Sequence, residues 1–148
     1  MPTNLLRRRA GNPPSSRKAP TQRLESTQVK LIIGGFSIRA ELHPTPSAQR
    51  LLAALPLYSN VETWGESIHF EIPVFGGRDR TARLNAQIGG FYYWAEEQRL
   101  ILVYGPTPIS GNGPIRLPRP CNVIGHTDDD LSVLRDVHPG QKVAMQPV

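Results

Sequence analysis

GGFYYWAEEQRLILVYGPTPISGNGPIRLPRPCNVIG, residues 89–125, decides the fold of this chain. It predicts an aromatic strand over Phe91–Trp94, a polar turn over Glu96–Arg99 and an apolar strand over Leu100–Tyr104. The segment Gly105–Pro120 follows, with five prolines and three glycines. Because proline cannot donate to a strand ladder, we expect this segment to be a loop that runs over the sheet. A short strand over Asn122–Gly125 ends the stretch.

The residues before this stretch predict two more hairpins and a helix. Gln28–Ile33 and Phe36–Leu42 flank Gly34-Gly35, and Leu57–Trp64 and Ile68–Val74 flank Gly65-Glu66. Between them, Thr45 is a suitable N-cap and Pro46 a suitable first helical residue for a short helix that ends at Pro56. Arg83–Gly90 leads into the central stretch, with Leu84 and Ile88 expected to point inward.

The chain after the central stretch predicts a short helix and a last strand. Asp128 or Asp129 is expected to cap a helix that runs through Leu134, and Lys142–Met145 to form the strand. The whole chain then has about eight strands, which would leave exposed edges unless the sheet closes. The predicted fold class is mainly β: a closed eight-stranded barrel with one or two short helices at its ends.

Charge divides the chain into a tail, residues 1–25, and a domain, residues 26–148. The tail holds six of the 17 basic residues and one of the 12 acidic residues, so the domain is formally neutral. With no apolar periodicity and several prolines, the tail is expected to be disordered. A solvated extension is the favoured interpretation. A nucleic-acid or membrane-surface arm and a transit peptide are the alternatives.

Composition excludes several classes of protein. No segment approaches the ~18 apolar residues that cross a bilayer. Cys121 is the only cysteine, so neither a disulfide framework nor a cysteine zinc cluster is expected. We therefore expect a cytoplasmic protein without a membrane partner, a metal or a cofactor.

Several runs together resemble a known family. They are LPLYSNVETWGESIHFEIPV (Leu55–Val74), GGFYYW, LILVYGPTPIS and CNVIGHTDDDLSVLRDVHPGQKV. In order and spacing they resemble a family of small, mostly prokaryotic proteins with a cyclophilin-like fold, over roughly Val29–Val143. The resemblance implies an eight-stranded closed barrel with short helices over its ends.

The same resemblance raises the question of prolyl isomerase activity. True cyclophilins place an arginine beside the prolyl nitrogen within a His-Arg-aliphatic-aliphatic-Pro segment. Here the nearest segment is His69–Pro73, with Phe70 where arginine would be. The cyclophilin strand with paired phenylalanines corresponds to Leu100–Val103, which has no aromatic residue. Cys121 stands where cyclophilins have a histidine. Isomerase activity is therefore not expected, because a fold does not carry an activity with it.

The candidate site is a groove beside Gly105–Pro120 that takes a small molecule or an extended peptide. Aromatic side chains offer stacking surface, and polar loop residues offer hydrogen bonds, although alternate aromatics must fill the barrel and turns favour Ser and Asn anyway. The predicted ligand-binding residues are Trp64, Tyr92, Trp94, Tyr104, Thr107, Ser110 and Asn122.

Other polar groups receive ordinary interpretations. His69 and Glu71 are expected on a solvated outer face, and Asp128–Asp130 in a capping turn. Cys121 is expected to be a small buried residue. Two functions remain as alternatives to ligand binding: a weak prolyl isomerase, and an interaction module that uses the basic tail to bind a protein or a nucleic acid.

Overall fold

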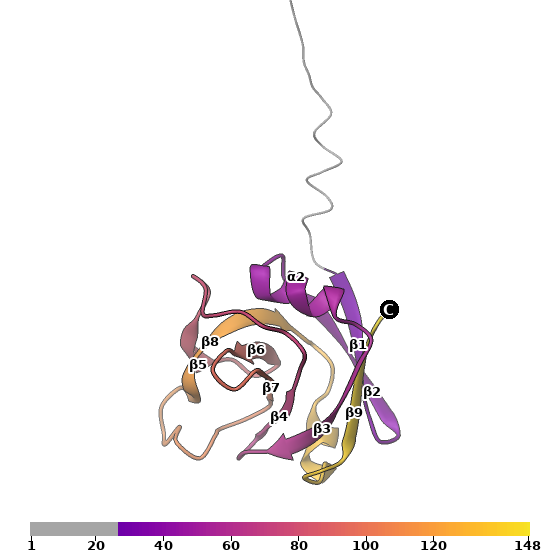
Figure 1. Ribbon diagram of the computed structural model, residues 1–148. Helices are drawn as coiled ribbons and strands as arrows, with labels where there is room; N and C mark the ends of the chain where they lie inside the picture. The colour runs from indigo at the N-terminus through magenta and orange to yellow at the C-terminus, as the bar shows by residue number, and fades with distance from the viewer. Residues whose placement is uncertain (1–26) are drawn as a thin grey trace, which may run out of the picture.

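The computed structural model describes residues 27–148, which contain nine strands, one α-helix and one 3-10 helix (Figure 1). Residues 1–26, and with them the predicted tail and its partners, lie outside the described residues. The elements are β1 (Thr27–Ile33), β2 (Phe36–Leu42), α2 (Pro46–Ala53), β3 (Leu57–Thr63), β4 (Ser67–Glu71), β5 (Arg83–Ala86), β6 (Gly90–Trp94), β7 (Arg99–Val103), β8 (Ile115–His126), η2 (Ser132–Asp136) and β9 (Lys142–Pro147).

Eight of the strands form a closed ring, which confirms the predicted mainly-β fold. Their order is β2-β1-β9-β3-β4-β7-β6-β8, and a pairing between β2 and β8 closes the circle. β5 is the ninth strand and pairs with the first half of β8, outside the ring. The second half of β8 pairs with β6 on one side and β2 on the other, so one long strand serves both the ring and its extension.

Local sequence explains why the hairpins and the helix form where they do. Gly34 and Gly65 adopt φ of 58° and 60°, which a side chain disfavours, at the turns of the first two hairpins. Thr45 caps α2 by accepting the N–H of Ala48, and Pro46 occupies the first helical turn. α2 covers one end of the ring, with Ala48 and Leu51 buried (Figure 1).

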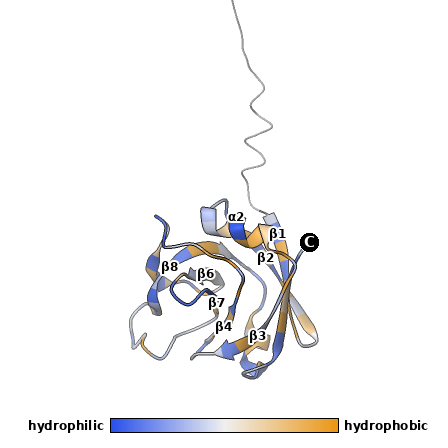
Figure 2. Ribbon diagram, in the orientation of Figure 1, coloured by the Kyte–Doolittle hydropathy of each residue, from blue (hydrophilic) through white to orange (hydrophobic). Residues whose placement is uncertain are grey.

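The side chains bury two separate cores. Alternating residues of the ring strands, such as Phe70, Phe91, Tyr93 and Leu102, fill the ring interior together with α2 and η2. The opposite face of β6 and β7 carries a second cluster, in which Tyr92, Ile101 and Val103 meet Ala86, Leu117 and Cys121. Figure 2 shows the hydrophobic and hydrophilic bands that alternate along the strands.

The second core corrects the prediction that Gly105–Pro120 is entirely a loop. Residues 115–120 belong to β8, and Leu117 is fully buried against the outer face of β6 and β7. Pro118 and Pro120 lie within the irregular part of the β5–β8 pairing, between the partners Asn85↔Arg116 and Arg83↔Cys121. A missing N–H is tolerated at such a bulge, which explains how a proline-rich segment enters a strand.

Three smaller predictions were also wrong. Leu84 and Ile88 do not point inward and are 37% and 66% exposed: Leu84 lies on the edge strand β5, which buries only Ala86, and Ile88 lies in the turn after it. Neither Asp128 nor Asp129 caps η2: Asp129 accepts the N–H of Arg39, and Asp130 accepts that of Ser132. The turn of the central hairpin is Ala95–Gln98, one residue earlier than expected.

No helix within residues 27–148 has the length and apolar character needed to cross a membrane.

Candidate functional site

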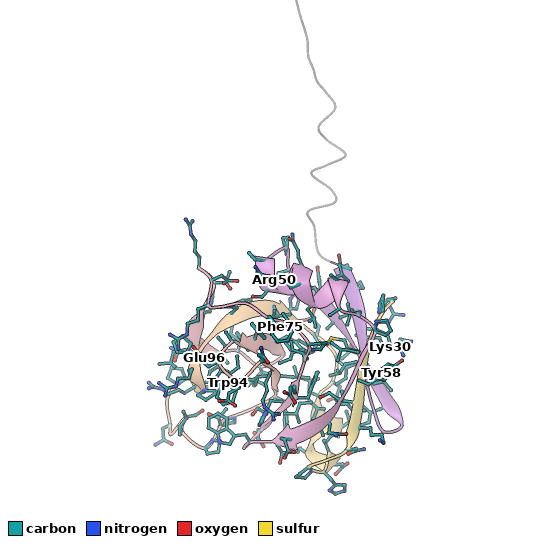
Figure 3. The ribbon with its side chains drawn as sticks, viewed as in Figure 1. Lys30, Arg50, Tyr58, Phe75, Trp94 and Glu96 are labelled. Atoms are coloured by element: carbon teal, nitrogen blue, oxygen red, sulfur yellow. The ribbon has the colours of Figure 1, made fainter. Side chains whose placement is uncertain are left out.

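An apolar cleft of about 220 Å³ lies at the outer face of the ring, beside the proline-rich segment. It is lined by Trp64, His69, Trp94, Ile101 and Pro118, and we call it the tryptophan cleft. Figure 3 shows Trp94 on the side of the ring opposite Tyr58 and Lys30. Its size suits one small ring or one side chain, below the ~300 Å³ where drug-sized pockets begin.

Strand pairing places the walls of the cleft. His69 and Ile101 are direct partners between β4 and β7, and Ile101 in turn partners Tyr92, two residues before Trp94 on β6. Successive residues of a strand point to opposite faces, so His69, Ile101 and Trp94 share the outer face. Trp64 closes the cleft from the turn between β3 and β4, where its carbonyl accepts the hydroxyl of Ser67 at 2.6 Å.

Two polar side chains of the cleft, Trp94 and His69, have a described hydrogen-bonding state. The indole Nε1–H of Trp94 is covered and has no hydrogen-bond partner among the described residues. Nη1 of Arg99 donates to Nδ1 of His69 at 3.4 Å, which leaves the ring proton of a neutral His69 on Nε2. Burial, and then the charge of Arg99, lower the pKa of His69, so this ring is neutral near pH 7.

The loop between β7 and β8 is held in place by its own hydroxyls. Ser110 Oγ accepts the N–H groups of Thr107 and Arg116, and Thr107 Oγ1 donates to the carbonyl of Arg116 at 2.6 Å. Gly65 lets the loop approach closely, since a Cβ there would lie 2.7 Å from Pro108 Cδ and 2.9 Å from the carbonyl oxygen of Pro106. Thr107 and Ser110 thus shape the loop that leads into Pro118.

Tyr104 and Asn122 do not line the tryptophan cleft. The Arg135 guanidinium sits 5.7 Å from the centre of the Tyr104 ring, and burial followed by the Glu66 carboxylate raises the pKa of Tyr104. Asn122 is fully buried; its amide donates to Ser47 and to the carbonyl of Gly77 and accepts the N–H of Asp79. These hydrogen bonds of Asn122 hold the segment before β5 against the ring.

Tyr92 belongs to a second cavity, of about 240 Å³, which we call the histidine cavity. His43 and His126 line it together with Tyr92 and Arg83. His43 Nε2 and His126 Nδ1 are 2.9 Å apart, although the two residues are 83 positions apart in sequence. The pairing of β2 with β8 brings them together.

Two other features are less suited to a site. A hollow of about 480 Å³ around Tyr58 and Val143 has a single aromatic wall, and Tyr58 is 72% exposed. Burial raises the pKa of the Cys121 thiol to about 12, so this cysteine is not a nucleophile near neutral pH. Among residues 27–148, no three His, Cys, Asp or Glu side chains are grouped closely enough to hold a metal ion.

The structure brings together only part of the predicted set. Trp64 and Trp94 line one cleft, and Tyr92 lines the other cavity; Tyr104, Thr107, Ser110 and Asn122 line neither. Sequence reasoning missed Ile101 and Pro118 as walls, and it did not single out His43. Alternation along Leu100–Val103 could have identified Ile101, whereas no local pattern links His43 to His126.

Comparisons with known proteins agree with this architecture. Residues 27–146 match the sequence profile of a family described as cyclophilin-like. The solution structure of a hypothetical protein, AF2241 from Archaeoglobus fulgidus, superposes with a TM-score of 0.73 at 25% sequence identity. The match covers 83% of this chain and 95% of the archaeal one. No curated protein sequence matches the chain significantly.

Proposed function

Because the chain belongs to the cyclophilin-like family, whose fold by itself assigns no activity, we propose a function from the site: this protein binds a small ligand in the tryptophan cleft. The ligand presents one flat or small apolar ring and a carbonyl-type acceptor. A small molecule or a single side chain of an extended peptide satisfies this description. A cytoplasmic location, in keeping with the single buried thiol of Cys121, is part of the proposal.

The observation that carries the proposal is that two tryptophans line the same cleft, and that the indole N–H of one of them has no hydrogen-bond partner among the described residues. Trp64 and Trp94 both line the cleft, with Pro118 as a third rigid wall. A covered N–H without a partner, such as Nε1 of Trp94, costs free energy that an acceptor on a ligand would recover after a small movement of the indole. Rigid aromatic walls lose little entropy when a ring enters.

Tryptophan fluorescence tests the proposal directly. The full chain is titrated with benzamide and with an acetylated prolyl amide, and we expect a saturable change in emission for at least one of them. Trp94→Phe keeps an aromatic wall but removes the donor, and should weaken binding roughly 3- to 10-fold. Trp64→Ala should weaken it roughly tenfold or more, because it removes a wall.

Tyr58→Ala is the matched control, since it removes an exposed aromatic side chain from the opposite side of the ring. It should leave the dissociation constants unchanged. A saturable response that survives Trp64→Ala, or no response to either probe, would contradict the proposal.

Weak prolyl isomerase activity is the alternative, and the position of Arg99 is the observation that favours it. Phe70 is fully buried in the ring interior and offers no cation, but Arg99 lies against His69, a wall of the cleft. A guanidinium near a proline ring could stabilise the twisted amide, whose barrier is ~18–20 kcal/mol. A coupled peptide assay with Arg99→Gln as the comparison decides between binding alone and catalysis.

A further inference from the structure

The histidine cavity is separate from the tryptophan cleft and has a different chemistry. It lies where β5, β6 and β8 meet the end of β2, and its polar walls are His43, Arg83, Gln87, Tyr92 and His126. None of the described residues that line it carries a carboxylate. The walls therefore offer mainly hydrogen-bond donors and positive charge.

Arg83 supplies the fixed charge of this cavity. Its side chain is exposed, and none of the ion pairs within residues 27–148 involves it. Its charge acts on Tyr92. Burial raises the pKa of the Tyr92 hydroxyl, and the charge of Arg83 offsets part of this rise. A guanidinium without a carboxylate partner is suited to a bidentate contact with an anion.

Tyr92 supplies a donor whose position is fixed by the fold. Its hydroxyl oxygen accepts the N–H of Gln87 at 2.9 Å, so the hydroxyl proton is left to donate elsewhere. The ring lies directly over the backbone of Gly90, where a Cβ would come within 2.5 Å of the hydroxyl oxygen. Glycine at position 90 is therefore required for this placement of the hydroxyl.

The two histidines form a chain that ends in carboxylates outside the cavity. Nε2 of His126 faces this acidic side, 3.7 Å from Glu41 Oε1 and 3.8 Å from Asp128 Oδ2. Nδ1 of His126 and Nε2 of His43 share a hydrogen bond of 2.9 Å, and in the tautomer with the His126 proton on Nε2, toward the carboxylates, His43 is the donor. Nδ1 of His43 remains available to take up a proton.

We propose that the histidine cavity is a binding site for the carboxylate or phosphate group of a small ligand, held by Arg83, Tyr92 and His43. The volume of about 240 Å³ accommodates such a group with a few further atoms. Glu41 and Asp128 lie on the far side of His126, in a hollow of their own, and do not line the cavity. An anion therefore enters without displacing an internal ion pair.

Binding of the anion is coupled to a proton. Burial and His126 lower the pKa of His43, and Glu41 opposes them, so His43 is neutral near pH 7 in the free protein. A bound anion favours the imidazolium form of His43, because opposite charges attract. Arg83 on β5 attracts the same anion. Affinity therefore rises as the pH falls.

The test is a titration of the full ¹⁵N-labelled chain, followed by two-dimensional NMR, with acetate and with inorganic phosphate in separate arms. Gly90 and Gly125 line the cavity, and their amide signals report on it even if anions also meet the basic residues 1–25. We expect saturable shifts of both signals with at least one anion, and the tighter anion identifies the group. Acetate keeps one charge from about pH 6 to about pH 8, and should bind at least roughly threefold tighter at the lower pH.

Arg83→Gln should weaken binding roughly tenfold or more without loss of the fold, because this side chain is exposed and forms no ion pair with any residue from 27 to 148. Arg80→Gln removes the same charge from the segment before β5, at a residue that does not line the cavity, and should leave the affinity unchanged. Equal weakening by the two variants, or no saturable shift of Gly90 and Gly125 with either anion, would overturn the proposal. Tyr92→Phe, expected to weaken binding severalfold, is a second check on the hydroxyl.

Discussion

Tyr93 and Trp94 are neighbours on β6, but their polar side-chain atoms differ in hydrogen bonding. Tyr93 is fully buried in the ring, and its hydroxyl donates to the carbonyl of Val74 at 2.6 Å. Trp94, on the other face, has a covered N–H that finds no partner within residues 27–148. One residue stabilises the fold through its polar atom, whereas the other keeps its polar atom unsatisfied at the site.

Removing each polar atom should therefore have different consequences for stability. We expect Tyr93→Phe to lower the free energy of unfolding by about 1–3 kcal/mol, because it leaves the buried carbonyl of Val74 unpaired. Trp94→Phe should change it by no more than about 1 kcal/mol, since relief of the unpaired donor offsets the smaller ring. Urea denaturation of both variants measures the difference; a larger loss for Trp94→Phe than for Tyr93→Phe would contradict this account.

Between elements, the turn of the second hairpin controls the proline-rich segment. Gly65 and Gly111 have almost the same φ, 60° and 61°, but only Gly65 is in contact with other segments. A Cβ at Gly65 would meet Pro106, Thr107 and Pro108, whereas no atom of the described part of the chain lies within 4 Å of one at Gly111. Alanine substitutions at the two glycines therefore distinguish the cost of backbone strain, which both share, from the cost of a steric clash with the loop, which arises only at Gly65.

We expect Gly65→Ala to destabilise the protein by about 1–3 kcal/mol beyond the effect of Gly111→Ala. It should also weaken ligand binding in the tryptophan cleft, because the loop that leads to Pro118 must move. Thermal denaturation and the fluorescence titration measure the two effects. Equal behaviour of the two variants would show that the contact of Gly65 with the loop is not required.

Two histidines with lowered pKa values, His43 beside the β2–β8 pairing and His69 on β4, should make stability depend on pH. The folded-state pKa of His43 is lowered from 6.5 by burial and by His126, and that of His69 is lowered by burial and by Arg99. A depressed histidine pKa means that the unfolded chain binds more protons, so stability is fully present above about pH 6.5 and is lost as the pH falls through the folded-state values. His43→Gln should reduce this loss, as measured by urea denaturation across the pH range. A dependence unchanged by His43→Gln would contradict the assignment.

For the whole molecule, alternation and turn residues were sufficient to predict the closed mainly-β fold. Phe36, Ile38, Ala40 and Leu42 alternate along one strand, and Gly34 marks its turn, so the first hairpin could be placed from sequence alone. These signals are local, and each concerns residues that remain neighbours in the folded chain.

What could not be predicted depends on contacts between distant segments. Pro118 has no backbone N–H, which disfavours a position in a strand. The bulge opposite β5 explains why the strand tolerates it here. His43 and His126 meet because the ring closes between them, which no spacing in the sequence reveals. Trp64 and Trp94 were predicted as site residues from their type, but their shared cleft follows from the β4–β7–β6 pairing.

The most direct test of the central claim, that the tryptophan cleft is a binding site, is the indole N–H signal of Trp94 in a two-dimensional ¹⁵N NMR spectrum. This signal is distinguished from that of Trp64 by comparison with Trp64→Phe, and the chain is then screened against small aromatic and prolyl amides. The account predicts that the ligands which bind shift the Trp94 indole signal downfield together with the Ile101 amide, as an acceptor reaches the N–H. Ligands that shift only residues around Tyr58, or a Trp94 indole signal that no compound moves, would contradict it.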